Sequence, residues 1–379
     1  MPSLTLGELT GRGGEDRLVS VRGDPAVLSG RSFALIASRQ SRGPSSSTPW
    51  VRAMRAAGEM LPEHAVVIGS VGELPYEVGR AVARARGLRV VDVLRAPLGA
   101  ECSDAALTIS MAGGPALRGP ERDELVLTLA DVAVAVAVRP GGSFVRRFEA
   151  LARTSPDRAW AVDGARVGLD ARVARGLEAL GCRLVDVSEP PIVQKPAERL
   201  APFTRVSFAE AAKAADWPFL THFTRAPRGP WAGESLRAYA ERLARGEVFE
   251  TSAEDTLARI VASRRLLACS ARLRGGPAVC FTERRPHELM ALKRHHRSLG
   301  RPRYEPFGIA VPREALEQLG ARPVCYGDEA VWASLPDEER WRFQHVGRTE
   351  RWTEEREWRF PRDLELSRLD PDSVRLVLP

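Results

Sequence analysis

The sequence predicts an α/β protein in which a doubly wound parallel sheet is followed by a second, mixed α+β domain. Short apolar runs alternate with amphipathic segments between residues 31 and 187, and this pattern stops beyond residue 216. A chain of 379 residues is long enough for two domains. We therefore expect an N-terminal extension, a sheet domain, a linker and a second domain, at residues 1–30, 31–190, 191–216 and 217–379.

The apolar runs of the first half have the length and composition of buried parallel strands. They are rich in Val and Ile, and amphipathic segments that could form crossover helices separate them. The expected strands are FALIAS (33–38), AVVIGS (65–70), LRVVDVL (88–94), DVAVAVAV (131–138), RAWAVD (158–163) and CRLVDV (182–187).

The second half has a different pattern. The prolines of SEPPIVQKPAERLAPF (188–203) break any regular element, which places the linker here. Beyond it, short apolar segments such as WPFLTHF (217–223) and AVCFT (278–282) surround one or two helical patterns, as in a mixed α+β domain.

Composition and charge bear on whether the protein binds nucleic acid. The formal net charge is +7, and a basic surface can bind the phosphates of nucleic acid. Nearly all the basic residues are arginines, and with the many Ala, Gly and Pro residues this bias is what a GC-rich coding sequence produces without selection for DNA binding. A nucleic-acid partner therefore stays open as an alternative.

The cysteines are scattered, with no CxxC pair and no metal-ligand spacing, and the first residues lack the apolar stretch of a secretory signal. We expect a cytoplasmic protein with reduced cysteines, no membrane segment and no metal site.

The loops that follow three of the expected strands predict a nucleotide site. In a doubly wound sheet, ligands bind beyond the carboxyl ends of the strands. These loops are SRQSRGPSSST (38–48), GSVGELPYE (69–77) and RPGGSF (139–144), which combine glycines, hydroxyls and arginines. Glycine lets the backbone approach a phosphate, and the following helix N-terminus offers N–H groups. The candidate ligand-binding residues are Ser38, Arg39, Gly69, Ser70, Gly72, Glu77, Arg139, Gly141, Gly142 and Ser143. The alternative is that these residues only shape and cap the turns.

The order of the strands, the Ser-Arg loop and the RPGG loop over residues 31–190 resemble the SLOG superfamily, a Rossmann-like group that includes LOG-type nucleotide phosphoribohydrolases and Smf DNA-processing proteins. LOG enzymes carry PGGxGTxxE, with a catalytic glutamate. This chain keeps Pro140, Gly141 and Gly142, but has Phe144, Val145 and Phe148 where the family has Gly, Thr and Glu. The resemblance therefore implies nucleotide binding without LOG-type turnover. Glu77 is the carboxylate that a hydrolase here would use, or else a residue that caps the next helix.

Polar residues of the second half suggest another site. His222 and Thr224 alternate with Phe223 on an extended segment, so both point to one face. Glu355 and Glu357 likewise share one face of an expected strand. A histidine, a hydroxyl and a carboxylate pair could bind a ribose and stabilise a developing cation. Structural hydrogen bonds and cross-strand ion pairs are the alternative.

The order of the motifs H-F-T, C-F-T-E, F-G-I-A, P-V-C-Y and E-R-E-W-R resembles bacterial abortive-infection-associated domains of unknown function and, more distantly, DarT-like ADP-ribosyltransferases. This resemblance implies that His222 and Thr224 bind NAD and that Glu355 or Glu357 is the late glutamate of that fold. Tyr304 and Tyr326 are the candidates for stacking on nicotinamide.

These patterns lead to one main functional hypothesis and two alternatives. The main one is a bacterial conflict, stress or anti-phage defence protein whose SLOG-like domain binds a nucleotide signal and whose C-terminal domain acts on NAD, as an ADP-ribosyltransferase or a glycohydrolase. The alternatives are a non-catalytic nucleotide-binding regulator that contacts protein or DNA, and a LOG-type nucleotide hydrolase. We expect no tightly bound cofactor, NAD or another nucleotide as ligand or substrate, and a homo-oligomer.

Overall fold

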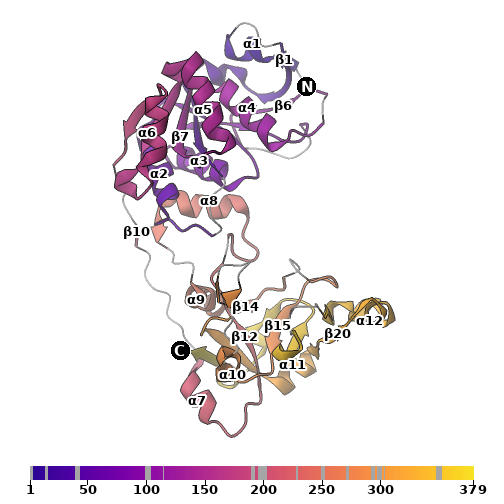
Figure 1. The fold of residues 1–379 in the computed structure, drawn as a ribbon. Coiled ribbons are helices and arrows are strands. Elements are labelled where there is room, and N and C mark those ends of the chain that lie inside the picture. Colours follow the sequence, from indigo (N-terminus) through magenta and orange to yellow (C-terminus); the bar gives the residue numbers. More distant parts are fainter. Residues whose placement is uncertain are drawn as a thin grey trace. The chain divides into compact units, whose positions relative to one another are not determined.

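The chain divides into two compact units, and the second part of the sequence contributes to both. The computed structural model describes residues 3–12, 16–38, 43–98, 104–113, 115–188, 193–194, 203–227, 229–248, 252–269, 273–291, 295–296, 301–302, 304–346 and 352–379. Unit 1 comprises Met1–Lys195 with Glu234–Phe249, and unit 2 comprises Pro196–Gly233 with Glu250–Pro379. Figure 1 labels their helices and strands.

Unit 1 is built on a sheet with the strand order β1-β2-β6-β5-β4-β3-β7-β8-β9. All neighbours from β6 to β9 run parallel, and only β1 and β2 are antiparallel to their neighbours. The predicted doubly wound parallel sheet is confirmed. The strands are β1 (Ser3–Thr5), β2 (Leu18–Gly23), β3 (Ser32–Ala37), β4 (Val66–Ser70), β5 (Arg89–Val93), β6 (Leu107–Met111), β7 (Val132–Ala137), β8 (Ala159–Asp163) and β9 (Arg183–Asp186).

Helices cover both faces of this sheet because the strands are apolar on both sides. In β7, Val132, Val134 and Val136 pack with one group of helices, whereas Ala133 and Ala135 pack with the other. The first group is α2 (Pro49–Glu59), α3 (Leu74–Ala85) and α8 (Leu236–Arg245). The second includes α1 (Leu6–Thr10), α4 (Gly119–Leu129), α5 (Ser143–Thr154) and α6 (Ala171–Ala179).

The N-terminal extension expected at residues 1–30 is wrong, because β1, α1 and β2 belong to unit 1. Val19 and Val21 of β2 and Leu6 of α1 are fully buried in the same core as the parallel strands. The short antiparallel strands thereby extend the sheet beyond β6.

Helix α8 follows the first strands of unit 2 in sequence but packs in unit 1. Tyr239, Ala240 and Leu243 are fully buried beside residues of α2 and α3, and Figure 1 shows α8 next to α3. A short parallel pair, β10 (Val193–Gln194) and β13 (Glu247–Val248), lies in the same unit. The expected assignment of all residues from 217 onward to one domain therefore needs correction.

Unit 2 contains a mixed sheet with the order β11-β24-β18-β12-β15-β22-β19, which agrees with the predicted α+β class. Its neighbours are antiparallel except for β11 and β24. The strands are β11 (Thr204–Ser207), β12 (Phe219–Phe223), β15 (Val279–Thr282), β18 (Gly308–Pro312), β19 (Arg322–Pro323), β22 (Glu357–Phe360) and β24 (Arg375–Leu378). Further two-residue or three-residue strands pair as β14 (Arg265–Leu266) with β23 (Leu364–Glu365), β16 (His295–His296) with β17 (Arg301–Pro302) and β20 (Cys325–Gly327) with β21 (Phe343–His345).

The described helices of unit 2 have 6 or 7 residues, except α9, which has 11. They are α7 (Phe208–Lys213), α9 (Ala253–Ser263), α10 (Pro286–Ala291), α11 (Arg313–Leu319) and α12 (Glu329–Ser334). Leu257 and Val261 of α9 pack with Leu220 and Ile309 in the main core of the unit.

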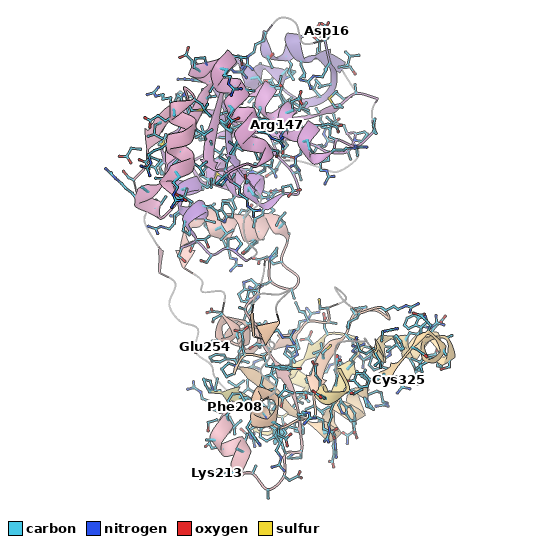
Figure 2. The ribbon with its side chains drawn as sticks, in the orientation of Figure 1. Asp16, Arg147, Phe208, Lys213, Glu254 and Cys325 are labelled. Carbon is cyan, nitrogen blue, oxygen red and sulfur yellow. The ribbon has the colours of Figure 1, made fainter. Side chains whose placement is uncertain are left out.

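The expected linker is also partly wrong, because residues 204–213 form β11 and α7. Thr204–Ser207 pairs with β24, and Ser207 then caps α7 by accepting a hydrogen bond from the N–H of Glu210. Figure 2 marks Phe208 and Lys213 at the two ends of this helix. The prolines that suggested a linker stop at residue 202, before this capping sequence begins.

No helix in the described part of the chain is both long and apolar enough to span a membrane.

Candidate functional site

The loops after β3 and β7 meet where the strand order reverses. From β3 the chain builds β4, β5 and β6 on one side, and then β7, β8 and β9 on the other. Just beyond the paired strands, the N–H of Ser38 donates to the carbonyl of Ala137 at 3.0 Å, and the Ser38 hydroxyl accepts from the N–H of Arg139 at 3.0 Å. The crevice at such a reversal is where open α/β sheets bind ligands. Two of the three predicted ligand loops are therefore adjacent here.

The RPGG turn brings the start of α5 to this crevice. Gly141 has a φ of +68°, which glycine adopts without strain, and the N–H of Gly142 donates to the Arg139 carbonyl at 3.1 Å. Gly142 is the N-cap residue and has no side chain with which to cap the helix. The first amides of α5, beginning at Ser143, have no acceptor within the helix and lie at its positive dipole end. The turn therefore presents N–H groups suited to an anion.

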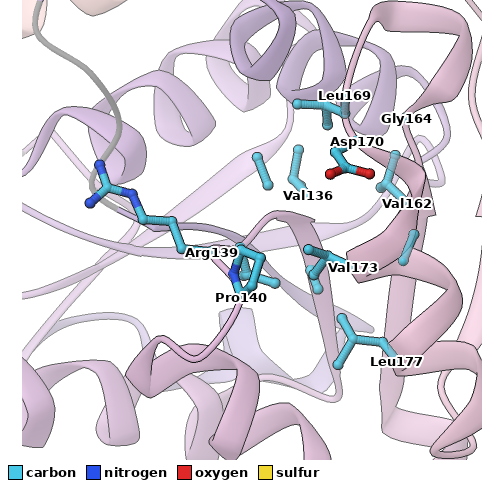
Figure 3. Close-up of a pocket in the computed structure, with 13 residues that line it drawn as sticks. Val136, Arg139, Pro140, Val162, Gly164, Leu169, Asp170, Val173 and Leu177 are labelled. Carbon is cyan, nitrogen blue, oxygen red and sulfur yellow. The ribbon is translucent and has the colours of Figure 1, made fainter.

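An apolar hollow of about 210 Å³ lies beside this turn. Pro140, Val136, Val162, Val173 and Leu177 line it, together with Asp170 at the start of α6. Figure 3 shows these side chains around the hollow, with Arg139 extending away from it. The N-cap residue Asp170 accepts a hydrogen bond from the N–H of Arg172 at 2.9 Å. The sequence interpretation missed this hollow because its walls are ordinary strand and helix residues.

The third predicted ligand loop, after β4, contributes internal structure instead. The fully buried Ser70 hydroxyl donates to the Val93 carbonyl at 3.0 Å. A Cβ on Gly69 would lie 2.8 Å from Cγ of Arg80, so this glycine makes room for that arginine.

Glu77 belongs to a buried charged group. One carboxylate oxygen accepts from the N–H of Gly72 at 2.9 Å, and the other pairs with Arg80 at 2.6 Å. Arg80 also pairs with the fully buried Asp92 at 2.5 Å. This geometry agrees with the alternative in which Glu77 fixes the start of α3. Gly72 itself has a φ of +89°.

Arg39, and Arg42 from the same loop, lie outside the described residues.

The LOG motif positions in α5 face the core. Phe148 is fully buried and Phe144 is nearly so, both in the cluster on one face of the sheet. The helix position at which LOG enzymes carry glutamate therefore holds a packing residue that cannot reach a ligand.

In unit 2, the His222 and Thr224 side chains form hydrogen bonds to backbone carbonyls. The Nδ1–H of His222 donates to the Cys280 carbonyl at 2.8 Å, which assigns the proton of the neutral ring to that nitrogen. Burial lowers the pKa of His222. The buried Thr224 hydroxyl bonds to the carbonyls of Ala253 at 2.7 Å and Phe307 at 3.1 Å.

The predicted glutamate pair does not share a strand face. Glu355 ends a 3-10 turn (Trp352–Glu355), and Arg356 has a φ of +44°, so the strand begins only at Glu357. This left-handed residue interrupts the alternation on which the prediction depended.

Glu357 also lies on the opposite sheet face from His222. In the register, Thr221 pairs with Thr282 and Thr282 with Glu357, so these three share a face. His222 points to the other face, where its ring contacts Phe281 edge-on at 5.9 Å. The expected convergence of His222 with Glu357 is therefore wrong.

The Glu357 carboxylate pairs with Arg359, which the sequence interpretation missed. Their Oε1 and Nε atoms are 2.9 Å apart, and Arg359 is 1% exposed. The Arg359 guanidinium also donates to the carbonyls of Trp341 and Phe343 and to the side chain of Gln344. The only sequence signal for this pair was the alternation of charges in EREWR, which is typical of a solvent-exposed strand face.

The two candidate stacking tyrosines are packed within unit 2. Tyr304 is buried edge-on against Phe223, with ring centroids 6.0 Å apart. The Tyr326 hydroxyl accepts from the N–H of Glu357 at 3.2 Å, and burial raises the pKa of Tyr326 to about 12.

Among the described His, Cys, Asp and Glu residues, no group of three is placed to hold a metal ion.

No protein-family model and no curated protein matches the sequence. Among solved structures, DNA processing protein A from Streptococcus pneumoniae is 14% identical, with 48% of this chain and 70% of that chain covered and a TM-score of 0.36. The Helicobacter pylori protein of the same name, described with a single-stranded DNA binding mode, is 12% identical over 48% of this chain and 91% of that chain, with a TM-score of 0.35. At these scores the similarity carries no argument about function.

Proposed function

We propose that this protein binds a nucleotide in unit 1, at the crevice between β3 and β7, and acts as a nucleotide-responsive regulator without LOG-type hydrolysis. The observation that carries the proposal is the contact of Ser38 with Arg139, which joins two glycine-containing and hydroxyl-containing loops at the strand-order reversal. The resemblance of residues 31–190 to SLOG proteins points to the same loops.

The phosphate would bind at the start of α5. The N–H groups of its first turn point out of the helix, Gly142 leaves them accessible, and the helix dipole favours negative charge. Arg139 is exposed at the same turn and can add a positive charge.

The base would enter the apolar hollow beside Pro140. A volume of about 210 Å³ is below the roughly 300 Å³ at which drug-sized sites begin, so it suits one ring system and not a whole nucleotide. Asp170 offers a carboxylate at its rim for an amino or hydroxyl group. This division places the phosphate on the turn and the ring in the hollow.

Catalysis is not part of the proposal. The Glu77 carboxylate is bonded to Gly72 and Arg80, and Phe148 replaces the LOG glutamate. NAD turnover in unit 2 stays a prediction, and the opposite placement of His222 and Glu357 gives it no geometric support.

Thermal unfolding of the full chain with AMP, ADP, ATP, cyclic AMP, NAD or inorganic phosphate tests the proposal. A ligand that binds only the native state stabilises it by about 2.7 kcal/mol at 100 times its Kd. We expect at least one nucleotide to raise Tm, and Arg139→Gln to weaken that nucleotide in calorimetric titration.

Arg153→Gln is the matched control, because Arg153 is exposed at the opposite end of α5. Equal affinity in the Arg139 and Arg153 variants, or no shift with any nucleotide, would overturn the proposal. Nicotinamide release measured in the NAD sample would reopen the enzymatic hypothesis for unit 2.

A further inference from the structure

We propose that Tyr239 of α8 is a positioning residue for the candidate nucleotide site, acting through residues 43–48 of the loop after β3. The inference depends on the proposed nucleotide site. It starts from an unusual feature of the chain: residues 234–249 leave unit 2, pack in unit 1 and return to unit 2.

The side chain of Tyr239 holds the loop between β3 and α2. Tyr239 is fully buried, and its hydroxyl donates to the carbonyl of Pro44, six residues beyond Ser38. The loop then closes on itself, because the Ser45 N–H donates to the Thr48 hydroxyl at 2.8 Å. Burial raises the pKa of Tyr239, so the phenol keeps its proton and remains a donor.

Other contacts fix α8 against α2 and α3. Nε of Arg55 in α2 donates to the Ala244 carbonyl at 3.1 Å. Asp104 accepts from Arg84 of α3 at 3.0 Å and from Arg237 of α8 at 2.7 Å. The position of α8 and the conformation of the 43–48 loop are therefore coupled.

A ligand that favours one conformation of residues 43–48 must then favour one position of α8 within unit 1, and the coupling is reciprocal.

Tyr239→Phe in the full chain tests the assignment, because it keeps the ring and removes only the donor. The probe is the member of the nucleotide panel with the largest thermal shift. We expect its Kd to rise by about fivefold or more, within the usual range of coupling between sites. Ser32→Ala is the control: it removes a buried hydroxyl that bonds to Asp131 at the other end of β3, and should leave Kd unchanged.

Hydrogen exchange gives a readout that general destabilisation would not produce. Without ligand, Tyr239→Phe should speed exchange in residues 43–48 more than Ser32→Ala does. With ligand, wild-type protein should gain protection in residues 236–245, and the variant should lose that gain. Arg237→Gln, on the exposed side of α8, should act in the same direction more weakly.

The outcomes separate the two proposals. Unchanged Kd and unchanged exchange in Tyr239→Phe would overturn the role of Tyr239 while leaving nucleotide binding intact. Protection of 43–48 without any change at 236–245 would overturn the coupling of this loop to α8. Faster exchange at 43–48 in Tyr239→Phe, with no nucleotide binding to any form, would support the loop contact and reject the proposed function.

Discussion

Replacing Arg359 by Met should destabilise unit 2 strongly, because Arg359 is buried at the centre of a set of acceptors. Its guanidinium pairs with Glu357 at 2.9 Å and donates to the carbonyls of Trp341 and Phe343 and to Gln344. Breaking a buried pair by removing one partner costs about 3–5 kcal/mol, and each lost hydrogen bond adds about 1 kcal/mol. The side chain of Gln344 is only half-buried and can bond to water instead, so the two carbonyls bring the expected loss to roughly 5 kcal/mol or more.

The double variant Arg359→Met/Glu357→Met separates the causes. It removes the stranded carboxylate as well, so only the cost of the two carbonyls should remain, roughly 2 kcal/mol. Urea unfolding followed by tryptophan fluorescence gives both free energies of unfolding, with Tm as a second measure. A loss of roughly 5 kcal/mol corresponds to a fall in Tm of about 10–20 °C for a domain of this size.

Equal destabilisation in the single and double variants would refute the reasoning, since it would mean that the Glu357 carboxylate is well solvated without Arg359. A single-variant loss below about 1 kcal/mol would refute it too, because exposed ion pairs are worth that little.

Three further predictions concern other residues. Burial lowers the pKa of His222 below that of the unfolded chain, so the unfolded state takes up the proton first as pH falls. Stability should therefore fall as pH drops below about 6.5, and it should fall less in His222→Gln. Chemical unfolding at several pH values measures both. Arg80→Met should cost unit 1 about 3–5 kcal/mol by stranding the buried carboxylates of Glu77 and Asp92, and calorimetric unfolding would contradict this if the variant melted like wild type. Gly141→Ala should cost about 1–2 kcal/mol in the same assay because of its φ of +68°, whereas a neutral result would mean that the turn adopts another conformation.

The parallel strands of unit 1 could be predicted because continuous apolar runs specify burial on both faces. Strand β6 was missed since Thr108 and Ser110 interrupt its apolar pattern. Both are buried in the sheet, and the Ser110 hydroxyl accepts from the N–H of Leu98 at 3.2 Å. A buried polar residue with a distant partner gives no periodic signal.

The candidate site of unit 1 could be predicted in part. The loops of Ser38 and Arg139 follow directly from strand ends, and the sheet topology makes them adjacent. From the sequence alone, Glu77 could equally have faced a ligand. Its burial depends on Arg80, which pairs with both Glu77 and Asp92, and Asp92 lies in the next strand of the sheet. In unit 2, the face of Glu357 depended on a single left-handed residue, Arg356, whose conformation no alternation rule predicts.

Helix α8 shows that the sequence did not specify which domain each helix joins either. Its amphipathic pattern, with Tyr239 and Leu243 on the buried side, specifies that one face must be covered but not which core covers it. The sequence order assigned it to the second domain, whereas the contacts place it on α3 in the first. The core beneath it includes Met54 and Val78, so unit 1 is complete only when residues from beyond the first strands of unit 2 have returned to it. The Tyr239 hydroxyl, which donates to the Pro44 carbonyl, thus joins the loop after β3 to a helix from the second half of the sequence, a contact that neither stretch of sequence predicts by itself.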